Sequence, residues 1–464
     1  MQEYVMNTFK IGAIALAMTM LTACGDDDEK EVAFGELKFY NASHNTGVVE
    51  IAAIDGDTQY NLTKVDKFNT SPNYYPDVTD YELLVNHQQP FIDEPIVVSQ
   101  QPFTISDDIL SLLILNDDAK QSELLSYTID PKSLDQVISD DKKNETNSFE
   151  IYSLNLSQNY QNVGLHYSFD NNSFSQAQLI TPLHDKQLSE SVAMAQGQYT
   201  FFITDEQGQL IYQSEQVAVE YQDSYIFAIR DDVNGENLVI DRFSKTSPVY
   251  HHYSTIAPAE LRFYQSDNTI GNVDLYIGDI DGEPSITDLA ADSLSQSITT
   301  MAGDITLSLT LSAQAQQVVF DNSLVSLAPR DDKNVLFYQD EDEIIRSIVF
   351  ENNNDFSVYE STITIVNLTQ QEHAINAYLV DENNSISQTP FNKENVAFSQ
   401  YVAIDSAQQQ FEVVITNTPT SDASDQFVLA QSSMIEFSEN TNYLIIVEPD
   451  TTASSGFSIN VIKQ

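Results

Sequence analysis

The sequence predicts an all-β protein made of four consecutive β-sandwiches, and three observations lead to this prediction. Polar and apolar residues alternate with a period of two, or β-forming residues dominate, in many short segments such as Thr362–Leu368 and Gln198–Thr204. Clusters of Asn, Asp, Ser and Gly separate these segments, and such clusters are typical of turns. The same ordered set of segments recurs along the chain, which indicates a repeated unit.

Three sequence blocks define the repeat, and each block keeps its place in all four copies. The first block is a strand, and aligning the ends of its four copies places Asn41, Asn155, Gln265 and Asn367 in one column. The second block begins at Thr79, Gly197, Gly303 and Gln409. The third begins at Asp107, Asp223, Lys333 and Thr441. Chance would not preserve three blocks in order four times, so the chain is predicted to contain four related units.

Each unit has room for about seven short strands, which is the number expected of an immunoglobulin-like sandwich. In the first unit the predicted strands are 36–41, 48–54, 60–68, 81–87, 96–105, 110–116 and 124–129. The chain has one cysteine and no tryptophan, so these are not antibody-type domains. In the first strand of units one, three and four, the residues expected to face the core are Leu37, Phe39, Leu261, Phe263, Ile363 and Ile365.

The predicted units span residues 31–131, 148–245, 258–351 and 357–464. We expect each unit to bury enough apolar surface to fold alone. The intervening segments are short and polar: Pro131–Asn147, Lys245–Pro258 and Asn352–Phe356. The longest, Pro131–Asn147, is expected to be exposed and to be cut first by proteases.

The net charge of −51 limits the partners that the chain can have. A nucleic-acid-binding protein needs a basic surface, so the charge excludes that class. A hydrophobic content of 41% is too high for a disordered acidic chain. The acidic surface is therefore interpreted as a means of keeping the protein soluble, and binding of divalent cations is the alternative interpretation.

The only cysteine follows an apolar run, Ile11–Ala23, that is too short to span a bilayer as a helix. A basic residue, Lys10, precedes this run, as in a secretory signal. The sequence Leu21-Thr22-Ala23-Cys24 resembles the lipobox of bacterial lipoproteins. An ordinary signal peptide with a chance cysteine is the alternative.

The lipobox resemblance implies a signal peptide over 1–23, a lipid on Cys24 and an acidic tether over 24–30. Gly25 stands where an aspartate would signal retention in the inner membrane. The resemblance therefore implies a protein anchored in the outer membrane that faces the periplasm or the cell exterior.

The third unit carries a second resemblance. Its segment Leu261–Gly282 resembles the opening of a bacterial family of unknown function, whose members read like V-R-V-x-H-A-S-P-D-A-P-x-V-D-V-Y-V-D-G. The match is best over Val273–Ile277, and the first unit keeps Asn41–Ser43 and Val49–Ile51. The histidine of the family motif is absent from all four copies. This resemblance implies tandem immunoglobulin-like domains on a secreted or anchored protein, and it implies no activity.

The sequence contains no nucleophile elbow, phosphate-binding loop, dinucleotide-binding fingerprint or zinc-protease helix motif. None of the seven histidines has a metal-ligand spacing. His251 and His252 lie between two tyrosines in the predicted linker, where an exposed polar role is expected and a metal or partner contact is the alternative. The sequence therefore predicts a protein that is not an enzyme.

Two acidic loops resemble calcium-binding loops, and calcium is the only cofactor that the sequence suggests. The candidate ligands are Asp279, Asp281 and Glu283 in one loop, and Asp231, Asp232 and Asn234 in the other. Neither loop completes the calcium-binding pattern of an EF-hand. Asp-Gly and Asn-Gly are also the commonest hairpin turns, so plain turns are the alternative.

In the aligned column, Asn41, Asn155 and Asn367 each begin a sequence that matches an N-glycosylation acceptor. Turn formation at a strand end is the preferred interpretation of all three.

Three function classes are compatible with these observations. The first is a non-catalytic array of immunoglobulin-like units that binds a protein or glycan ligand, mediates adhesion or acts as a spacer. The second is a protein that binds carbohydrate or an envelope polymer, because 23 tyrosines could stack on sugars although tryptophan is missing. The third is a hydrolase with a site that the sequence does not reveal.

Overall fold

The computed structural model confirms the all-β prediction. It describes residues 33–89, 94–107, 109–116, 122–129, 148–169, 173–233, 235–266, 269–340, 342–352, 358–407, 409–418 and 426–464. These residues form strands and two short 3-10 helices, η2 (Phe174–Gln176) and η3 (Gln370–Glu372). No helix among them is long and apolar enough to cross a membrane.

Unit 1 contains seven strands in two sheets, one ordered β1-β6-β7 and the other β3-β2-β4-β5. The strands are β1 (Glu36–Asn41), β2 (Val49–Asp55), β3 (Thr58–Val65), β4 (Asp80–His87), β5 (Ile96–Thr104), β6 (Leu110–Asn116) and β7 (Glu123–Ile129). Each lies within a few residues of the strand predicted for it, because alternation and turn residues mark its ends clearly.

Unit 2 forms a sheet ordered β11-β8-β14-β15-β16 and a second sheet ordered β10-β9-β12-β13. Its strands are β8 (Ser148–Asn155), β9 (Asn162–Phe169), β10 (Gln178–His184), β11 (Val192–Ala195), β12 (Gly197–Thr204), β13 (Leu210–Val219), β14 (Ser224–Asp231), β15 (Leu238–Ser244) and β16 (Tyr250–Tyr253). The linker predicted over 245–258 is wrong in its middle, because β16 pairs with β15 and extends the sheet.

Units 3 and 4 repeat this plan. The strands of unit 3 are β17 (Ala259–Gln265), β18 (Val273–Ile277), β19 (Ile286–Leu289), β20 (Ser293–Leu294), β21 (Ile298–Thr300), β22 (Gly303–Leu311), β23 (Gln314–Leu327), β24 (Asp332–Gln339) and β25 (Ile345–Glu351). Those of unit 4 are β26 (Glu360–Asn367), β27 (Ala374–Val380), β28 (Asn392–Ala397), β29 (Tyr401–Ala407), β30 (Gln409–Asn417), β31 (Val428–Gln431), β32 (Ile435–Phe437), β33 (Thr441–Pro449) and β34 (Phe457–Lys463).

The four units share one connectivity. The first strand of each unit pairs in parallel with the penultimate long strand, as β1 pairs with β6, β8 with β14, β17 with β24 and β26 with β33. The last strand then pairs antiparallel to the penultimate one. We call the sheet that contains the first strand the inner sheet, and the other the outer sheet. The chain is therefore a series of four related β-sandwiches.

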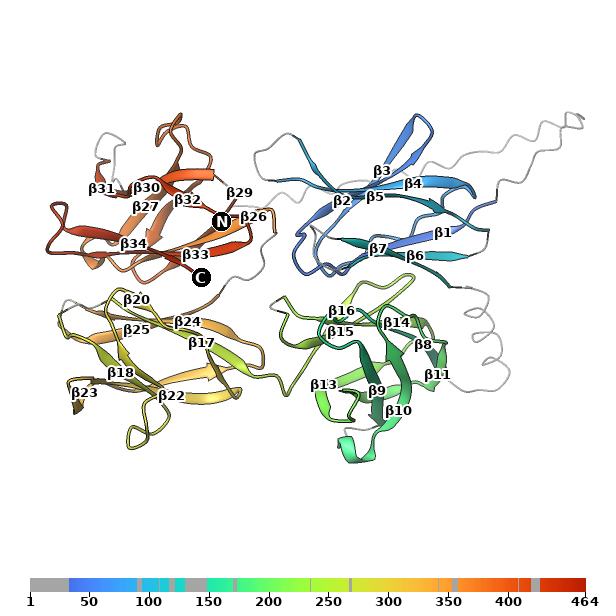
Figure 1. Ribbon diagram of the computed structural model, residues 1–464, viewed down its shortest axis with the longest axis horizontal. Helices are drawn as coiled ribbons and strands as arrows, with labels where there is room; N and C mark the ends of the chain where they lie inside the picture. The colour runs from blue at the N-terminus through green and yellow to red at the C-terminus, as the bar shows by residue number, and fades with distance from the viewer. Residues whose placement is uncertain are drawn as a thin grey trace, which may run out of the picture.

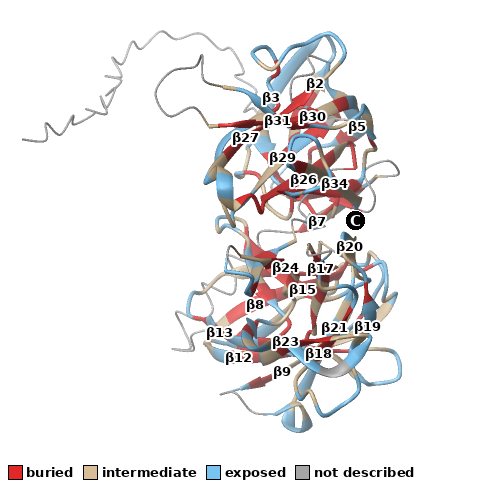
Figure 2. Cartoon of the chain, turned by 90° about the vertical axis from the view of Figure 1, so that its left-hand side faces the viewer, coloured by how far each residue is buried: buried red, intermediate tan, exposed pale blue. Residues whose placement is uncertain are grey.

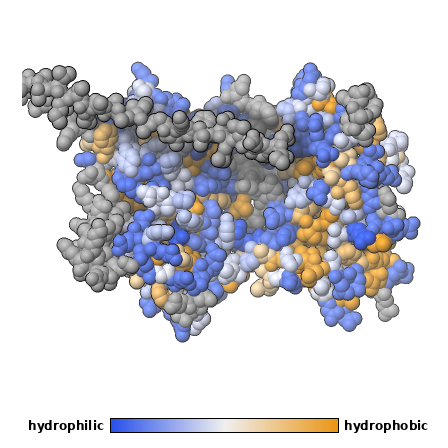
Figure 3. Space-filling model, turned by 180° about the vertical axis from the view of Figure 1, so that it is seen from behind, coloured by the Kyte–Doolittle hydropathy of each residue, from blue (hydrophilic) through white to orange (hydrophobic). Residues whose placement is uncertain are grey.

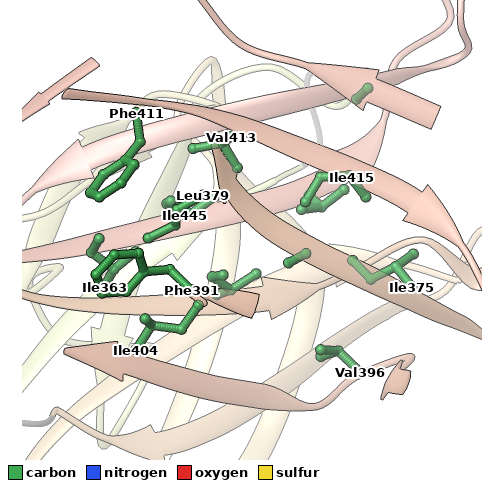
Figure 4. Packing of buried hydrophobic residues seen from close by; sticks show 14 of the residues in the cluster. Ile363, Ile375, Leu379, Phe391, Val396, Ile404, Phe411, Val413, Ile415 and Ile445 are labelled. Carbon is green, nitrogen blue, oxygen red and sulfur yellow. The ribbon is translucent and has the colours of Figure 1, made fainter. Parts of the chain in front are cut away.

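Each sandwich has its own apolar core between its two sheets. The core of unit 4 is built from inward-facing residues of both sheets, including Ile363, Ile375, Phe411 and Ile445 (Figure 4). Equivalent clusters fill units 1, 2 and 3. The six first-strand residues predicted to face the core are all at most 2% exposed and lie in these clusters. Alternation with a period of two therefore identified the buried face correctly.

The opposite face of each inner sheet is buried as well, because the units pack in pairs. Units 1 and 2 share an apolar cluster that contains Tyr40, Leu112 and Ile114 from unit 1, with Ile226 and Phe243 from unit 2. A corresponding cluster joins units 3 and 4 through residues such as Tyr264, Leu336, Val366, Leu444 and Ile446. Each pair therefore stacks inner sheet against inner sheet.

The two pairs lie side by side, so that units 1 and 4 form one layer and units 2 and 3 form the other (Figures 1 and 2). His87 of unit 1 approaches Glu360 of unit 4 at 3.1 Å, and the amide of Val358 donates to the carbonyl of Asn45. Arg330 of unit 3 lies over the ring of Tyr253 in unit 2, with its guanidinium carbon 3.6 Å from the ring centroid. The four units form a two-by-two block.

Candidate functional site

A buried ionic network explains how the first pair of units is held in register. Asp241 is fully buried and accepts hydrogen bonds from Arg230 at 2.7 and 3.2 Å and from the hydroxyl of Tyr40, in unit 1, at 2.5 Å. Burial raises the pKa of this carboxyl and the adjacent guanidinium lowers it, and the net shift is downward. Arg230 also lies 3.3 Å above the ring centroid of Phe68 in unit 1. The network is structural, because its buried groups already bond to one another.

Because the inner sheets are used in pairing, ligands can reach chiefly the outer sheets and the unit edges. An open groove of about 680 Å3 lies on the outer sheet of unit 4. It is lined by Tyr378, Val380, Ser385, Ile386, Ser387, Thr389, Asn392, Glu394, Glu412, Val414, Thr416, Gln426, Phe427, Val428 and Gln431. We call it the unit 4 groove.

The floor of the unit 4 groove follows from strand alternation on β27 and β30. Leu379 and Val413 point into the core of the sandwich, so Tyr378, Val380 and Val414 point to the opposite face. Tyr378 lies opposite Val414 in the register of the two strands, and Ile386 packs on this small cluster. The floor is therefore an aromatic and aliphatic surface.

A folded loop between β27 and β28 forms one wall of the groove. Asp381 accepts hydrogen bonds from the amide of Asn383 at 2.7 Å and from the side chain of Asn384 at 2.6 Å. Thr389 donates to the carbonyl of Leu379 at 2.5 Å, which ties the end of the loop to β27. These bonds hold Ile386 and its flanking serines over the sheet, so the wall is formed without a ligand.

The opposite wall carries an exposed aromatic ring beside an ordered polar cluster. Phe427 is 56% exposed, and its amide donates to the side chain of Asn417 at 2.7 Å. The amide group of Gln426 donates to the hydroxyls of Tyr378 and Thr416, both at 2.9 Å. Thr416 donates its own proton to the carbonyl of Asn417 at 3.1 Å. The Tyr378 hydroxyl acts as an acceptor from Gln426, so its proton remains available to a ligand.

The composition of the lining restricts what the groove can bind. Its charged residues are two carboxylates, Glu394 and Glu412, and it has no Lys, Arg, His or Cys. Phosphate and nucleic acid are therefore unfavourable ligands. Aromatic and aliphatic surface with hydroxyl, amide and carboxylate groups around it suits a neutral, hydroxyl-rich ligand.

A second, smaller cleft of about 520 Å3 lies in unit 2, and we call it the unit 2 cleft. Tyr221 and Tyr250, which are 74% and 48% exposed, lie in its lining with Tyr225. The guanidinium carbon of Arg242 is 5.1 Å from the ring centroid of Tyr250 and 5.4 Å from that of Tyr225. The cleft therefore presents two exposed tyrosine rings, one of them beside a guanidinium. Seen from behind, hydrophobic residues gather on the half of the molecule formed by units 3 and 4 (Figure 3).

The loop of Asp279, Asp281 and Glu283 is an exposed turn. The carboxylate of Asp279 accepts the amide of Asp281 at 3.0 Å, and its carbonyl accepts the amide of Gly282 at 3.2 Å. Among the described residues, no three His, Cys, Asp or Glu side chains converge in a metal-binding arrangement. The geometry supports a turn, and calcium in this loop stays a prediction.

The second predicted calcium loop uses its carboxylates to cap neighbouring groups. Asp231 accepts the hydroxyl of Ser157 at 2.6 Å and the amide of Gln158 at 2.8 Å, and burial raises its pKa. Asp232 accepts the amide of Glu236 at 3.0 Å. Asn234 lies outside the described residues, as does Cys24 with the whole predicted signal and tether.

The two adjacent histidines are not in an exposed linker, which corrects the sequence-based expectation. Both belong to β16, and His251 is 2.8 Å from the carboxylate of Asp241. His252 is 6% exposed, and burial lowers its pKa to about 4. The polar flanks of the segment hid the strand, since its four residues pair with β15 without a long apolar run.

The asparagines of the glycosylation-like sequences are buried, as the turn interpretation implies. Asn41, Asn155 and Asn367 are all 0% exposed. Each side-chain amide donates to a backbone carbonyl in its own unit, at 3.0, 2.7 and 2.9 Å. Gln265 does the same in unit 3, at 2.9 Å. The aligned column is therefore a repeated amide that ties the end of the first strand to the loop that follows it in units 1, 2 and 3, and to β28 in unit 4.

Comparison with known proteins adds weak structural neighbours only. No family model matches the chain, and no curated protein matches it. Among solved structures, the TIE protein of Bacillus anthracis is 9% identical over 90% of this chain and 69% of its own, with a TM-score of 0.17. A candidate adhesin from Bacteroides ovatus is 7% identical, covering 47% of this chain and 95% of its own, with a TM-score of 0.14.

The major pilin subunit of Bacillus cereus is 8% identical, covering 70% of this chain and 97% of its own, with a TM-score of 0.13. TM-scores this low carry no functional argument. The assignment of the fold rests on the strand pairing described above.

Proposed function

We propose that this chain is a non-catalytic cell-envelope lipoprotein that binds a neutral polysaccharide in the unit 4 groove. The observation that supports it is the pairing of an aromatic floor at Tyr378 with an exposed ring at Phe427 across a groove rich in hydroxyl and amide groups. Sugar rings present an apolar face and a polar edge, and such a groove can satisfy both.

The block arrangement also supports a binding role over a spacer role. Four units strung end to end would extend far from a membrane, whereas the described contacts fold them into two adjacent pairs. Lipid on Cys24, as the lipobox resemblance implies, would tether this block at the membrane surface. The groove would then meet polymer that lies close to that membrane.

The test is binding of the intact mature protein to an array of envelope glycans, followed by titration calorimetry with the best ligand. Phe427→Ala removes the exposed ring without touching the core, and we expect its affinity to fall at least tenfold. Tyr75→Ala is the matched control, because Tyr75 is 60% exposed and belongs to unit 1, far along the chain from the groove.

Unchanged affinity in Phe427→Ala would overturn the assignment of the groove. If the protein binds members of a peptide library but no glycan, the assignment of a polysaccharide ligand is overturned. The unit 2 cleft is tested with Tyr250→Ala, which we expect to leave affinity for a short oligosaccharide unchanged and to weaken binding of a long polymer that spans both sites.

A further inference from the structure

A polar cavity of about 390 Å3 lies at the junction of units 3 and 4. It is lined by Ser266, Thr269, Asp292, Gln339, Glu448, Pro449, Asp450, Thr451, Thr452, Ser458 and Asn460. All but Pro449 carry a polar side chain, and none is a Lys, Arg or His. Residues before 352 come from unit 3 and those after 358 from unit 4, so the cavity is built by both.

Glu448 is the unusual residue of this cavity. It lies on β33, is 3% exposed, and its Oε1 accepts the hydroxyl of Tyr264 at 3.0 Å and the amide of Asn460. Its Oε2 is buried and makes no hydrogen bond of ordinary geometry among the described residues, although the side chains of Ser266 and Asp292 are close enough to shift the pKa of the carboxyl. A buried carboxylate oxygen without a partner is rare in native proteins, because burial removes its hydrogen bonds to water and nothing replaces them.

The first pair of units shows what is missing here. Tyr40 and Tyr264 are equivalent residues, each immediately before the aligned amide of its unit, and each donates to a buried acid of the partner unit. In units 1 and 2 that acid, Asp241, is paired with Arg230. In units 3 and 4 no described cation takes the corresponding place beside Glu448.

Asp292 adds a second carboxylate to the same cavity. It lies just before β20 in unit 3, and its charge together with burial raises the pKa of Glu448 to about 7. With Asp450, three carboxylates and several hydroxyl and amide oxygens therefore line one polar cavity. Hard cations prefer oxygen ligands of this kind.

We propose that this cavity binds calcium, with Glu448 and Asp292 as the charged ligands and with oxygens of Ser266 and Gln339 available to complete the shell. The third carboxylate of the lining, Asp450, already accepts the amide and the hydroxyl of Thr452, both at 2.7 Å. With two carboxylates left as ligands, the dissociation constant is expected in the range of about 0.1 to 1 mM that is found in extracellular modules. The ion would join unit 3 to unit 4 and occupy the role that Arg230 has in the other pair.

The test uses the intact mature chain and terbium as a luminescent substitute for calcium. The protein has no tryptophan, so tyrosine sensitises the ion, and Tyr264 bonds directly to Glu448. We expect tyrosine-sensitised emission that millimolar calcium displaces, and a calcium-induced rise in melting temperature beyond that of sodium at equal ionic strength.

Glu448→Gln keeps the size of the side chain and removes its charge, and we expect it to weaken calcium binding at least tenfold and to abolish the thermal shift. Asp292→Asn is the second variant if the first does not fold. The double variant Asp279→Asn/Asp281→Asn, on the exposed turn, is the matched control and should keep the full response. The proposal would be overturned if wild type and Glu448→Gln respond equally to calcium, or if only the turn variant loses the response. It would also be overturned if calcium raises the melting temperature no more than sodium does.

Discussion

Replacing Asp241 by Asn should be among the most destabilising single changes in the chain, although it alters no side-chain volume. The substitution leaves Arg230, which is 3% exposed, as a buried cation without its anion. At 2.7 Å and an effective dielectric of about 20, the lost attraction is roughly 6 kcal/mol. Removing one member of a buried pair typically costs about 3–5 kcal/mol, and we expect a loss in that range.

The assay is guanidinium unfolding followed by tyrosine fluorescence and circular dichroism, with the free energy of the first transition extrapolated to water. The double variant Arg230→Met/Asp241→Asn removes the uncompensated charge, so it should be more stable than Asp241→Asn alone. A loss below about 1 kcal/mol in Asp241→Asn, or additive effects of the two substitutions, would refute the reasoning.

The same network carries a pH dependence whose sign can be stated. The folded-state pKa of Asp241 is depressed, so its contribution to stability is present above the ordinary aspartate pKa and is lost as pH falls through the folded-state value. Asp241→Asn should therefore reduce the loss of stability in acid, compared with wild type under the same conditions.

Three further predictions follow from particular residues. Between pH 6.5 and 4 the imidazole of His252 is protonated in the unfolded chain but stays neutral when buried, which lowers the free energy of unfolding by roughly 3 kcal/mol as the pH falls. His252→Leu should remove this pH dependence. An unchanged pH profile would contradict the burial of His252. Cys24→Ser should release the protein from membranes and stop labelling by a palmitate analogue, and continued labelling would exclude the lipobox interpretation. A fragment of units 3 and 4 should melt in one cooperative transition and stay soluble, whereas unit 4 alone would expose Val366, Leu444 and Ile446 and should aggregate; a stable isolated unit 4 would show that pairing is dispensable.

The sandwich architecture could be predicted because its signals are local. In β1, Leu37 and Phe39 alternate with other residues and lie in the sandwich core, as the period of two requires. The strand ends of unit 1 are marked by turn residues. The aligned amides Asn41, Asn155 and Asn367 recur because each ties the end of the first strand to a backbone carbonyl elsewhere in its unit.

The pairing of the units was missed, although a signal for it is present. The segments Leu112–Leu115 and Tyr443–Val447 are continuous apolar runs, whereas a strand with one solvated face alternates. Such runs indicate burial on both faces, which here means the core on one side and the neighbouring unit on the other. The prediction that each unit folds alone overlooked this second buried face.

The unit 4 groove could not be predicted from local patterns. Tyr378 and Phe427 are far apart in the sequence and are brought together by the register of β27, β30 and β31 and by the folded loop after Val380. In the same way, Glu448 is one acidic residue among 70, and only its burial between two units distinguishes it. In the acidic loops that are visible in sequence, Asp279, Asp231 and Asp232 accept backbone amides, and calcium binding there stays a prediction.

The most direct test of the account is hydrogen–deuterium exchange of the mature protein with and without the glycan that binds it best. We predict slower exchange confined to the segments that form the unit 4 groove, residues 378–394, 412–416 and 426–431, with units 1 and 3 unchanged. Protection that falls in another unit, or none at all under saturating glycan, would contradict the claim that this groove is the binding site.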